Sequence, residues 1–272
     1  HDPLATQALQ RFLIGSIARA FEPGCAMDWM PVLVGEQGAG KSQFAARLAP
    51  PELFAEMPAS LPKLQAEPYR LHVAWVLELP EVDALFKANM REEFKNLIST
   101  RTDVVRRPYD RYPTSLARKF CFIGTTNTKT FLNDPTGNRR FIPLQLPEGK
   151  EVNSRQLDTI RDSLWATAFK HYRQNERYVY HSGEIKEIND YLVQFKEEDA
   201  WIEQISAYID DYEEVSINEI LIHLGIDPKN QTTTHTKRAS AILTELGWAN
   251  NGKRRKVGKS KIRVWEAPAH LR

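Results

Sequence analysis

The chain has 272 residues and a mass of 31.3 kDa, a length typical of one or two domains. Hydrophobic residues make up 42% of it and charged residues 26%, and the mean hydropathy is -0.49. These values are typical of a globular protein and exclude a membrane-spanning chain, a disordered chain and a fibrous repeat. Lys and Arg total 37 against 35 Asp and Glu, so the net charge is only +2.

The basic residues are concentrated in two segments. Residues 250–263 contain seven Lys or Arg and no acid, and residues 101–119 contain six bases against two acids. Clusters of one sign on a nearly neutral chain indicate surfaces that face an anion, although an ordinary solvated face has the same composition.

The cysteines and the first residues bear on the cellular compartment. Cys25 and Cys121 are too few for a disulfide framework, and Cys121 lies in an apolar run where we expect it to be buried. No zinc-ligand spacing or signal peptide is visible, which favours a reducing cytoplasm. The missing initiator Met leads us to expect a piece of a longer protein.

Apolar periodicity predicts an alternation of helices and strands over the first 150 residues. Helices are expected at 4–21, 41–49 and 83–98, and strands at 30–35, 71–79, 118–126 and 140–146. Strands separated by helices predict an α/β fold with a parallel sheet covered on both faces.

The pattern changes after Pro147. Helices are expected at 154–174 and 184–197, and a compact module begins near residue 198. Three short helices, the second with a capping box at Ser216 and Glu219, precede two strands at 253–257 and 261–265. This is a winged-helix order. We therefore expect a core over 1–150, a helical connector over 151–198 and a winged-helix domain over 199–272.

Residues 35–42 match the phosphate-loop pattern G-x-x-x-x-G-K-[ST] between a predicted strand and a predicted helix. Glycines let the backbone wrap a phosphate, and the helix N-terminus supplies positive potential. Lys41 would reach the β- and γ-phosphates, and Ser42 would bind Mg²⁺. The candidate nucleotide-binding residues are Gly35, Gln37, Gly38, Ala39, Gly40, Lys41, Ser42 and Gln43.

Polar residues at the ends of the next strands are candidates for the hydrolysis of ATP. Glu78 and Glu81 follow the apolar run of the second strand, and we favour Glu78 near the metal and Glu81 near the water. An acid that merely closes a buried strand is the structural alternative. Asn127 ends the third strand, where it would orient the attacking water. The N-K-x-D pattern of guanine sites is absent there, which favours adenine.

Arg139 and Arg140 precede the fourth strand. An arginine suits the bridging of γ-phosphate oxygens in the transition state, because it is always charged and binds bidentately. We expect one of the two to act as a finger on a neighbouring subunit and the other to make a structural ion pair, and the spacing does not choose between them.

Five motifs in order, GEQGAGKS, WVLELPE, RRPYDR, IGTTN and TGNRRF, resemble the virulence-associated protein E family of phages and mobile islands. That family is similar to superfamily 3 replicative helicases, which are AAA+ ring ATPases. The resemblance covers roughly residues 5–145. It implies a hexameric ring, nucleotide at subunit interfaces, single-stranded DNA in a central pore and an upstream primase-like region. One departure is that Glu78 and Glu81 are three apart, where superfamily 3 members carry adjacent acids.

The resemblance also implies a pore-lining hairpin between the second and third strands. Here that segment is Thr102 to Thr114, with Arg106, Arg107, Tyr109 and Arg111. Arginines neutralise phosphates and Tyr109 would stack on a base, unless Arg107 to Tyr109 pack structurally.

The C-terminal module offers a second DNA surface. Its wing carries Lys253, Arg254, Arg255 and Lys256, and its third helix carries Lys237 and Arg238 near the N-terminal end. Duplex origin DNA is the expected ligand, and a protein partner is the alternative. Trp248 and Trp265 are expected in the core.

Three functions follow in order of preference. The first is an ATP- and Mg²⁺-dependent DNA helicase motor for replication of a mobile element. The second is a nucleotide-gated DNA-binding initiator or regulator without processive unwinding. The third is an ATPase whose partner is a protein.

Overall fold

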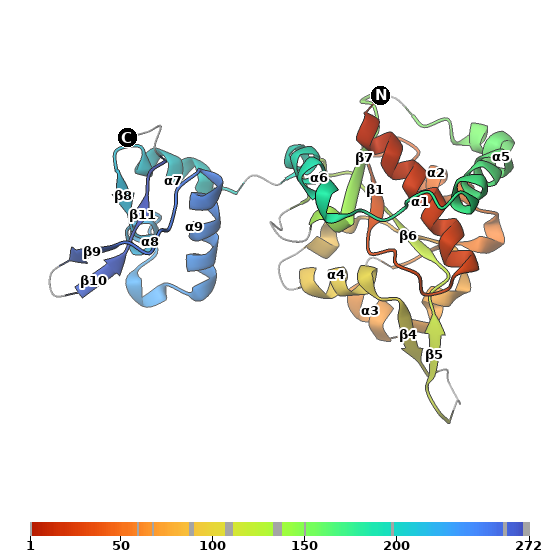
Figure 1. Cartoon of the computed structure of the whole chain (residues 1–272), viewed down its shortest axis with the longest axis horizontal. Helices are drawn as coiled ribbons and strands as arrows, with labels where there is room; N and C mark the ends of the chain where they lie inside the picture. Colours follow the sequence, from red (N-terminus) through yellow and green to blue (C-terminus); the bar gives the residue numbers. More distant parts are fainter. Residues whose placement is uncertain are drawn as a thin grey trace. The chain divides into compact units, whose positions relative to one another are not determined.

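The computed structural model describes residues 2–58, 60–66, 68–86, 90–106, 111–132, 138–149, 151–196, 199–257 and 260–268. The chain forms two compact units, His1–Glu197 and Glu198–Arg272 (Figure 1). The helices expected as a connector over 151–198 belong to the first unit, in which α5 (Ser154–Arg173) contacts both α1 (Pro3–Phe21) and α2 (Lys41–Leu48).

A five-stranded parallel sheet forms the centre of the first unit, as predicted. Its order is β2-β3-β6-β1-β7. The strands are β1 (Met30–Val34), β2 (Phe54–Glu56), β3 (Val76–Leu79), β6 (Cys121–Thr126) and β7 (Phe141–Gln145). All residues of β1, β3 and β6 are buried, which explains why their sequences are continuous apolar runs.

Two predicted elements are shorter than expected. The predicted strand 71–79 is wrong in its first half, where Pro68–Val73 forms a 3₁₀ turn. Strand β3 starts at Val76 because both neighbouring strands begin opposite that residue. The predicted helix 83–98 is a 3₁₀ turn at Val82–Phe86 followed by α4 (Arg91–Ser99). Strand β2 was not predicted.

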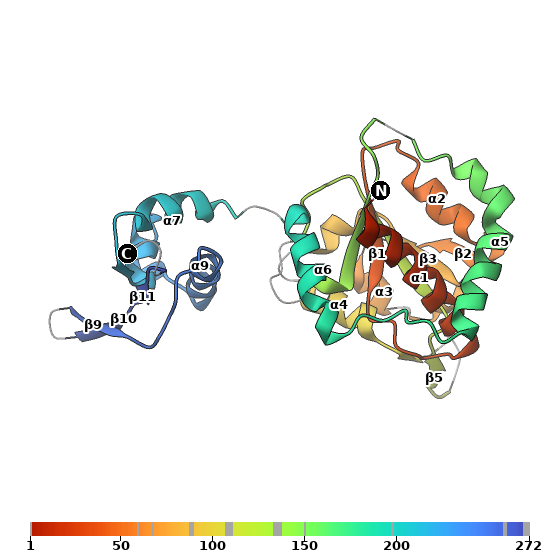
Figure 2. The same cartoon turned by 45° about the horizontal axis from the view of Figure 1, so that its top comes forward.

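Helices flank the sheet, and their packing forms one hydrophobic core (Figure 2). Helix α1 begins where Asp2 accepts hydrogen bonds from the N–H groups of Leu4 and Ala5, and it packs on β1, β7 and α5. The remaining helices of this unit are α3 (Leu61–Ala66) and α6 (Ile185–Leu192). No helix in the described ranges is long and apolar enough to cross a bilayer.

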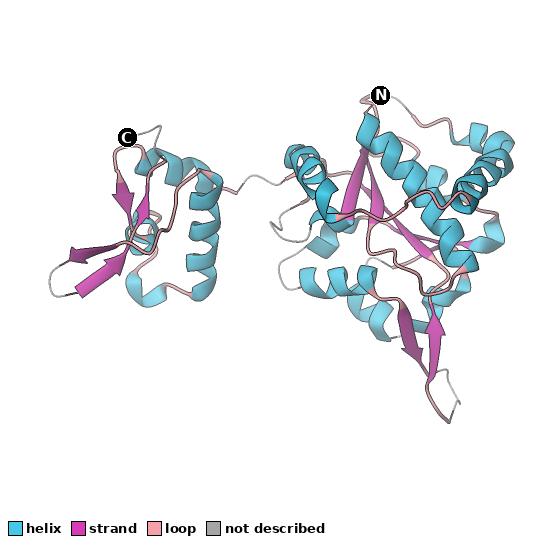
Figure 3. Ribbon diagram, viewed as in Figure 1, coloured by secondary structure: helices cyan, strands magenta, loops and turns pink. Residues whose placement is uncertain are grey.

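The hairpin expected between the second and third strands is present. Strands β4 (Thr102–Val105) and β5 (Thr114–Ala117) pair antiparallel and project beyond the sheet (Figure 3). A buried cluster holds its base. Arg118 is 2% exposed, donates to both carboxylate oxygens of Asp103 at 2.7 Å each and also donates to the carbonyl of Leu97. His72 Nε2 lies 3.0 Å from Asp103 Oδ2.

The second unit has its own core, which includes Trp248 and Trp265 as expected. Its helices are α7 (Trp201–Ile209), α8 (Ile217–His223) and α9 (Thr233–Glu245). The predicted capping box at Ser216 and Glu219 starts α8. Two antiparallel pairs complete the unit, β8 (Glu214–Val215) with β11 (Trp265–Glu266), and β9 (Arg254–Val257) with β10 (Ser260–Arg263).

Candidate nucleotide site

The loop between β1 and α2 has the backbone shape of a phosphate cradle. Gly38 and Gly40 have φ values of +85° and +81°, a conformation that strongly favours glycine. A Cβ on Gly40 would also lie 3.2 Å from the carbonyl oxygen of Val152. Helix α2 starts at Lys41, so its first N–H groups, which have no acceptor within the helix, point toward the loop.

Lys41 is buried and lies across this loop. Its Nζ donates to the carbonyls of Gly35 at 2.8 Å and Glu36 at 2.7 Å, and to Asn127 Oδ1 at 2.8 Å. Burial lowers the pKa of Lys41 below its ordinary value. Asn127 reaches Lys41 because β6 lies beside β1 in parallel, so that their carboxyl ends meet at one edge of the sheet.

Glu78 lies on β3 at the same edge and is 1% exposed. Its Oε1 accepts a hydrogen bond from Thr125 Oγ1 at 2.9 Å, and the Ser42 hydroxyl also bonds to its carboxylate. Burial raises the pKa of Glu78, and the two hydroxyl hydrogen bonds act in the opposite direction. The structure therefore joins the two predicted metal ligands, Ser42 and Glu78, and adds Thr125, which the sequence analysis missed.

Glu81 differs from Glu78 in its surroundings. It is exposed and has a φ of +49°, an uncommon conformation for a residue other than glycine. The neighbouring Asp83 accepts a hydrogen bond from Thr126 Oγ1 at 2.6 Å and is a second acid near the end of β6 that sequence reasoning missed. The signal for both threonines was present, because Thr125 and Thr126 are hydroxyl residues at the end of an apolar strand.

A cleft of about 460 Å³, including space open to solvent, lies beside the phosphate loop. It is bounded by the loop, by the end of β6 and by the segment after β7, and its polar lining consists of Glu36, Asn127, Lys129, Gln145 and Glu148. The part of this cleft that water-sized groups can occupy is about 110 Å³, which is less than the volume of a typical pocket for a small ligand. Gln43 lies nearby on α2 and accepts a hydrogen bond from Ser154 at 3.2 Å.

Arg139 and Arg140 lie at the amino ends of the strands, whereas the phosphate loop lies at their carboxyl ends. They precede β7, which runs parallel to β1 with Met30 opposite Phe141. The five residues of β1 therefore separate them from the phosphate loop by about 16 Å, at about 3.3 Å per residue. Arg140 is partly buried and its Nε donates to Ser99 Oγ at 3.0 Å, whereas Arg139 is exposed.

Two of the candidate DNA residues of the first unit are described, and both lie between β4 and β5. These are Arg106 and Arg111, and the Arg111 guanidinium lies 5.4 Å from the ring centre of Tyr112. Arg107 and Tyr109 fall outside the described residues.

Several candidate DNA residues of the second unit are engaged within that unit. Arg238 donates to both carboxylate oxygens of Asp199 at 2.8 Å and stacks on Trp201. Lys253 pairs with Glu214 and Glu266. The remaining pair is Arg255 with Glu219. Lys237, Arg254 and Lys256 are exposed and make no ion pair with a described residue.

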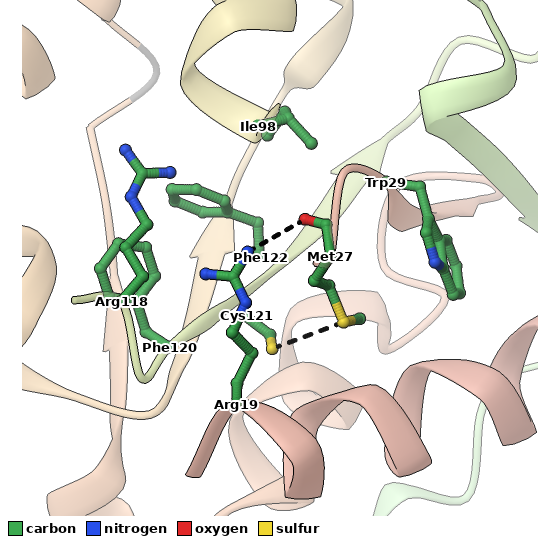
Figure 4. A pocket seen from close by; sticks show the side chains of 8 residues that line it. All are labelled: Arg19, Met27, Trp29, Ile98, Arg118, Phe120, Cys121 and Phe122. Atoms are coloured by element: carbon green, nitrogen blue, oxygen red, sulfur yellow. Dashed lines mark hydrogen bonds between the residues drawn. The ribbon is translucent and has the colours of Figure 1, made fainter. Parts of the chain in front are cut away.

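A small pocket under α1 has a different character (Figure 4). Arg19 donates to the carbonyl of Met27 at 3.3 Å, and Cys121 Sγ lies 3.9 Å from Met27 Sδ. Burial raises the pKa of Cys121 to about 11, so the thiol stays protonated and unreactive at neutral pH. The expectation that Cys121 is simply buried is confirmed.

Comparison with known proteins identifies the family. Two solved structures of the NrS-1 C-terminal region are similar, each with a TM-score of 0.52 and 98% of this chain covered. The first, an A form apo structure, is 14% identical over 72% of its length, and the second is 15% identical over 76%. At this identity the likeness shows the fold alone, and no curated protein matches the sequence. Residues 1–198, more than half of the chain, match the virulence-associated protein E-like domain, so this protein belongs to that family.

Proposed function

We propose that this chain is the ATP-driven motor of a DNA helicase, which acts as a hexameric ring on single-stranded DNA in the replication of a phage or mobile element. The observation that carries the proposal is the meeting of Lys41, Ser42, Glu78 and Asn127 at one edge of the sheet. A phosphate loop alone would support only nucleotide binding.

The residues present fit a magnesium nucleotide. The loop N–H groups and Lys41 would hold the phosphates, and Ser42 and Glu78 provide oxygen ligands of the kind that Mg²⁺ prefers. When bound, the ion would neutralise charge that develops on the phosphate oxygens. Asn127 and a carboxylate, Glu78 or Glu81, would hold the attacking water.

The position of the arginines supports a shared site. Arg139 lies about 16 Å from the phosphate loop of its own chain, at the far end of β1 and β7, which exceeds the reach of one arginine side chain. A finger at this position would serve a neighbouring subunit, as a ring requires. Arg139 is the better candidate, because Arg140 bonds to Ser99.

The test is ATP hydrolysis with and without single-stranded DNA, together with the mass by light scattering. Lys41→Ala is the control that removes phosphate contacts. Turnover that DNA stimulates, in a particle of six-fold mass, supports the motor and leads to strand-displacement assays. Absence of ATP turnover at any protein concentration, with nucleotide still bound, overturns it.

A nucleotide-gated initiator or regulator is the second candidate. It is favoured by the second unit, a compact module whose element order resembles a winged helix and whose exposed cations would bind duplex DNA. ATP-dependent binding of duplex DNA without strand displacement would favour this function over the motor.

A further inference from the structure

The β9–β10 ribbon places four cations on one of its faces. Directly opposite residues in an antiparallel pair share a face, and so do residues two apart along a strand. The register sets Arg254 opposite Arg263 and Lys256 opposite Lys261. Arg254, Lys256, Lys261 and Arg263 therefore form one group, which we call the ribbon face, and all four side chains are exposed.

The other face of the ribbon is turned toward its own unit. Arg255 and Ile262 are opposite each other on that face. The Arg255 guanidinium pairs with Glu219 and donates to the carbonyl of Glu214 at 3.3 Å, and Ile262 is partly buried. The two faces thus have different roles, although the sequence of this segment is basic throughout.

Some cations of this unit have a described carboxylate as a partner and others do not. Lys253, Arg255 and Arg238 each pair with a carboxylate, whereas no carboxylate among the described residues pairs with the ribbon face. Like charges directly opposite each other destabilise a strand pair. Two such pairs on one ribbon are an arrangement that a polyanion would stabilise.

The spacing suits a regular row of anions. Residues two apart along a strand are separated by about 6.8 Å, and opposite residues by about 5 Å. The ribbon face contains no apolar or aromatic residue. Protein interfaces have apolar or aromatic centres and are depleted in Lys, so an acidic protein fits this surface less well than a phosphate backbone does.

We propose that the ribbon face binds the sugar–phosphate backbone of duplex DNA without sequence preference, and that Lys253, Arg255 and Arg238 hold the ribbon and α9 in place instead. The inference refines the DNA contact of the proposed function, but it does not depend on ATP hydrolysis.

The experiment measures the affinity of the full chain for a labelled random-sequence duplex, without nucleotide, as a function of salt. In the test variant all four ribbon-face residues are changed to Gln. Each lost phosphate contact lowers the slope of log affinity against log salt by about 0.9, so we expect a loss of up to about 3.6. When salt is raised from 50 to 200 mM, both proteins lose affinity for the duplex. The fold-loss should be about 150 times smaller in the variant than in the unmodified protein. In the pair variant, Lys256→Gln with Lys261→Gln, the slope should fall by about half as much as in the four-residue variant.

A matched control removes the same charge from the first unit. It changes four exposed cations to Gln: Lys170, Arg173, Arg177 and Lys186. Its slope should change by less than about 1. The thermal midpoint of the ribbon variant should be unchanged or higher, because a repulsion is removed, and this separates lost contacts from misfolding.

Three results would overturn the proposal: an unchanged slope in the ribbon variant, an equal loss in the control, or equally strong binding of a poly-glutamate peptide. Failure of the proposed function is recognised separately, as absence of ATP turnover. DNA binding by Lys41→Ala should keep the unmodified slope in either case.

Discussion

The buried Arg118–Asp103 pair gives a quantitative test of how the hairpin is fixed. We consider Arg118→Met, which has a similar length and no charge. The change removes three side-chain hydrogen bonds, two to Asp103 and one to the Leu97 carbonyl. Asp103 is only 8% exposed and would retain His72 as its one partner among those described.

The expected cost is about 3–5 kcal/mol of unfolding free energy, the range for breaking one side of a buried ion pair. Most of it comes from the carboxylate left buried without its cation. The double variant Arg118→Met with Asp103→Leu removes both charges, so it should recover most of the loss. Arg47→Met is the control, because the Arg47–Asp158 pair is partly exposed to solvent and should contribute less than about 1 kcal/mol.

Urea unfolding followed by tryptophan fluorescence measures these differences, with the transition of the first unit analysed separately from that of the second. Single-stranded DNA binding should fall with stability in Arg118→Met and return in the double variant. The reasoning is refuted if Arg118→Met costs less than about 1 kcal/mol, or if the double variant is as unstable as the single one.

Three further changes test the site and the sheet. Glu78→Gln should abolish ATP turnover and raise the thermal midpoint, because burial raises the pKa of Glu78 and so disfavours its charged form. The gain in midpoint should grow as the pH rises above 4.5, and a difference in midpoint that does not depend on pH would contradict this reasoning. Gly124→Ala should cost about 1–3 kcal/mol in urea unfolding, since its Cβ would lie 2.8 Å from the Met30 methyl group, and a neutral effect would show that the strand can shift. Arg139→Ala subunits, inactive alone, should regain ATPase activity when mixed with Lys41→Ala subunits, and no recovery in mixed rings would exclude a shared site.

Sequence patterns located the parts of the site that lie next to each other in the chain. The phosphate loop and the ends of β3 and β6 were visible because glycine spacing and strand-end polarity are local features. The strand pairs were not visible, so the hydrogen bond between Thr125 and Glu78 and that between Thr126 and Asp83 could not be predicted. Each joins residues more than forty positions apart.

Apolar runs also gave errors of length. Leu71 is buried but belongs to a 3₁₀ turn, and an apolar run alone does not distinguish a strand from such a turn. In the basic segment, composition could not separate Arg255, which pairs with Glu219, from Lys256, which pairs with no described carboxylate. Strand alternation puts the two on opposite faces, and the contacts of Arg255 with Glu219 and Glu214 show which face is turned toward the unit.

Strand β6 has a consequence for how the molecule can move. It is hydrogen-bonded to β1 on one side and β3 on the other, and all six of its residues are buried. The hairpin base precedes its first residue and Asn127 follows its last, about 20 Å away. Sliding of the hairpin relative to the nucleotide site would break both ladders. In the proposed motor, a movement of β6 along DNA would therefore carry the sheet of the first unit with it as one rigid body.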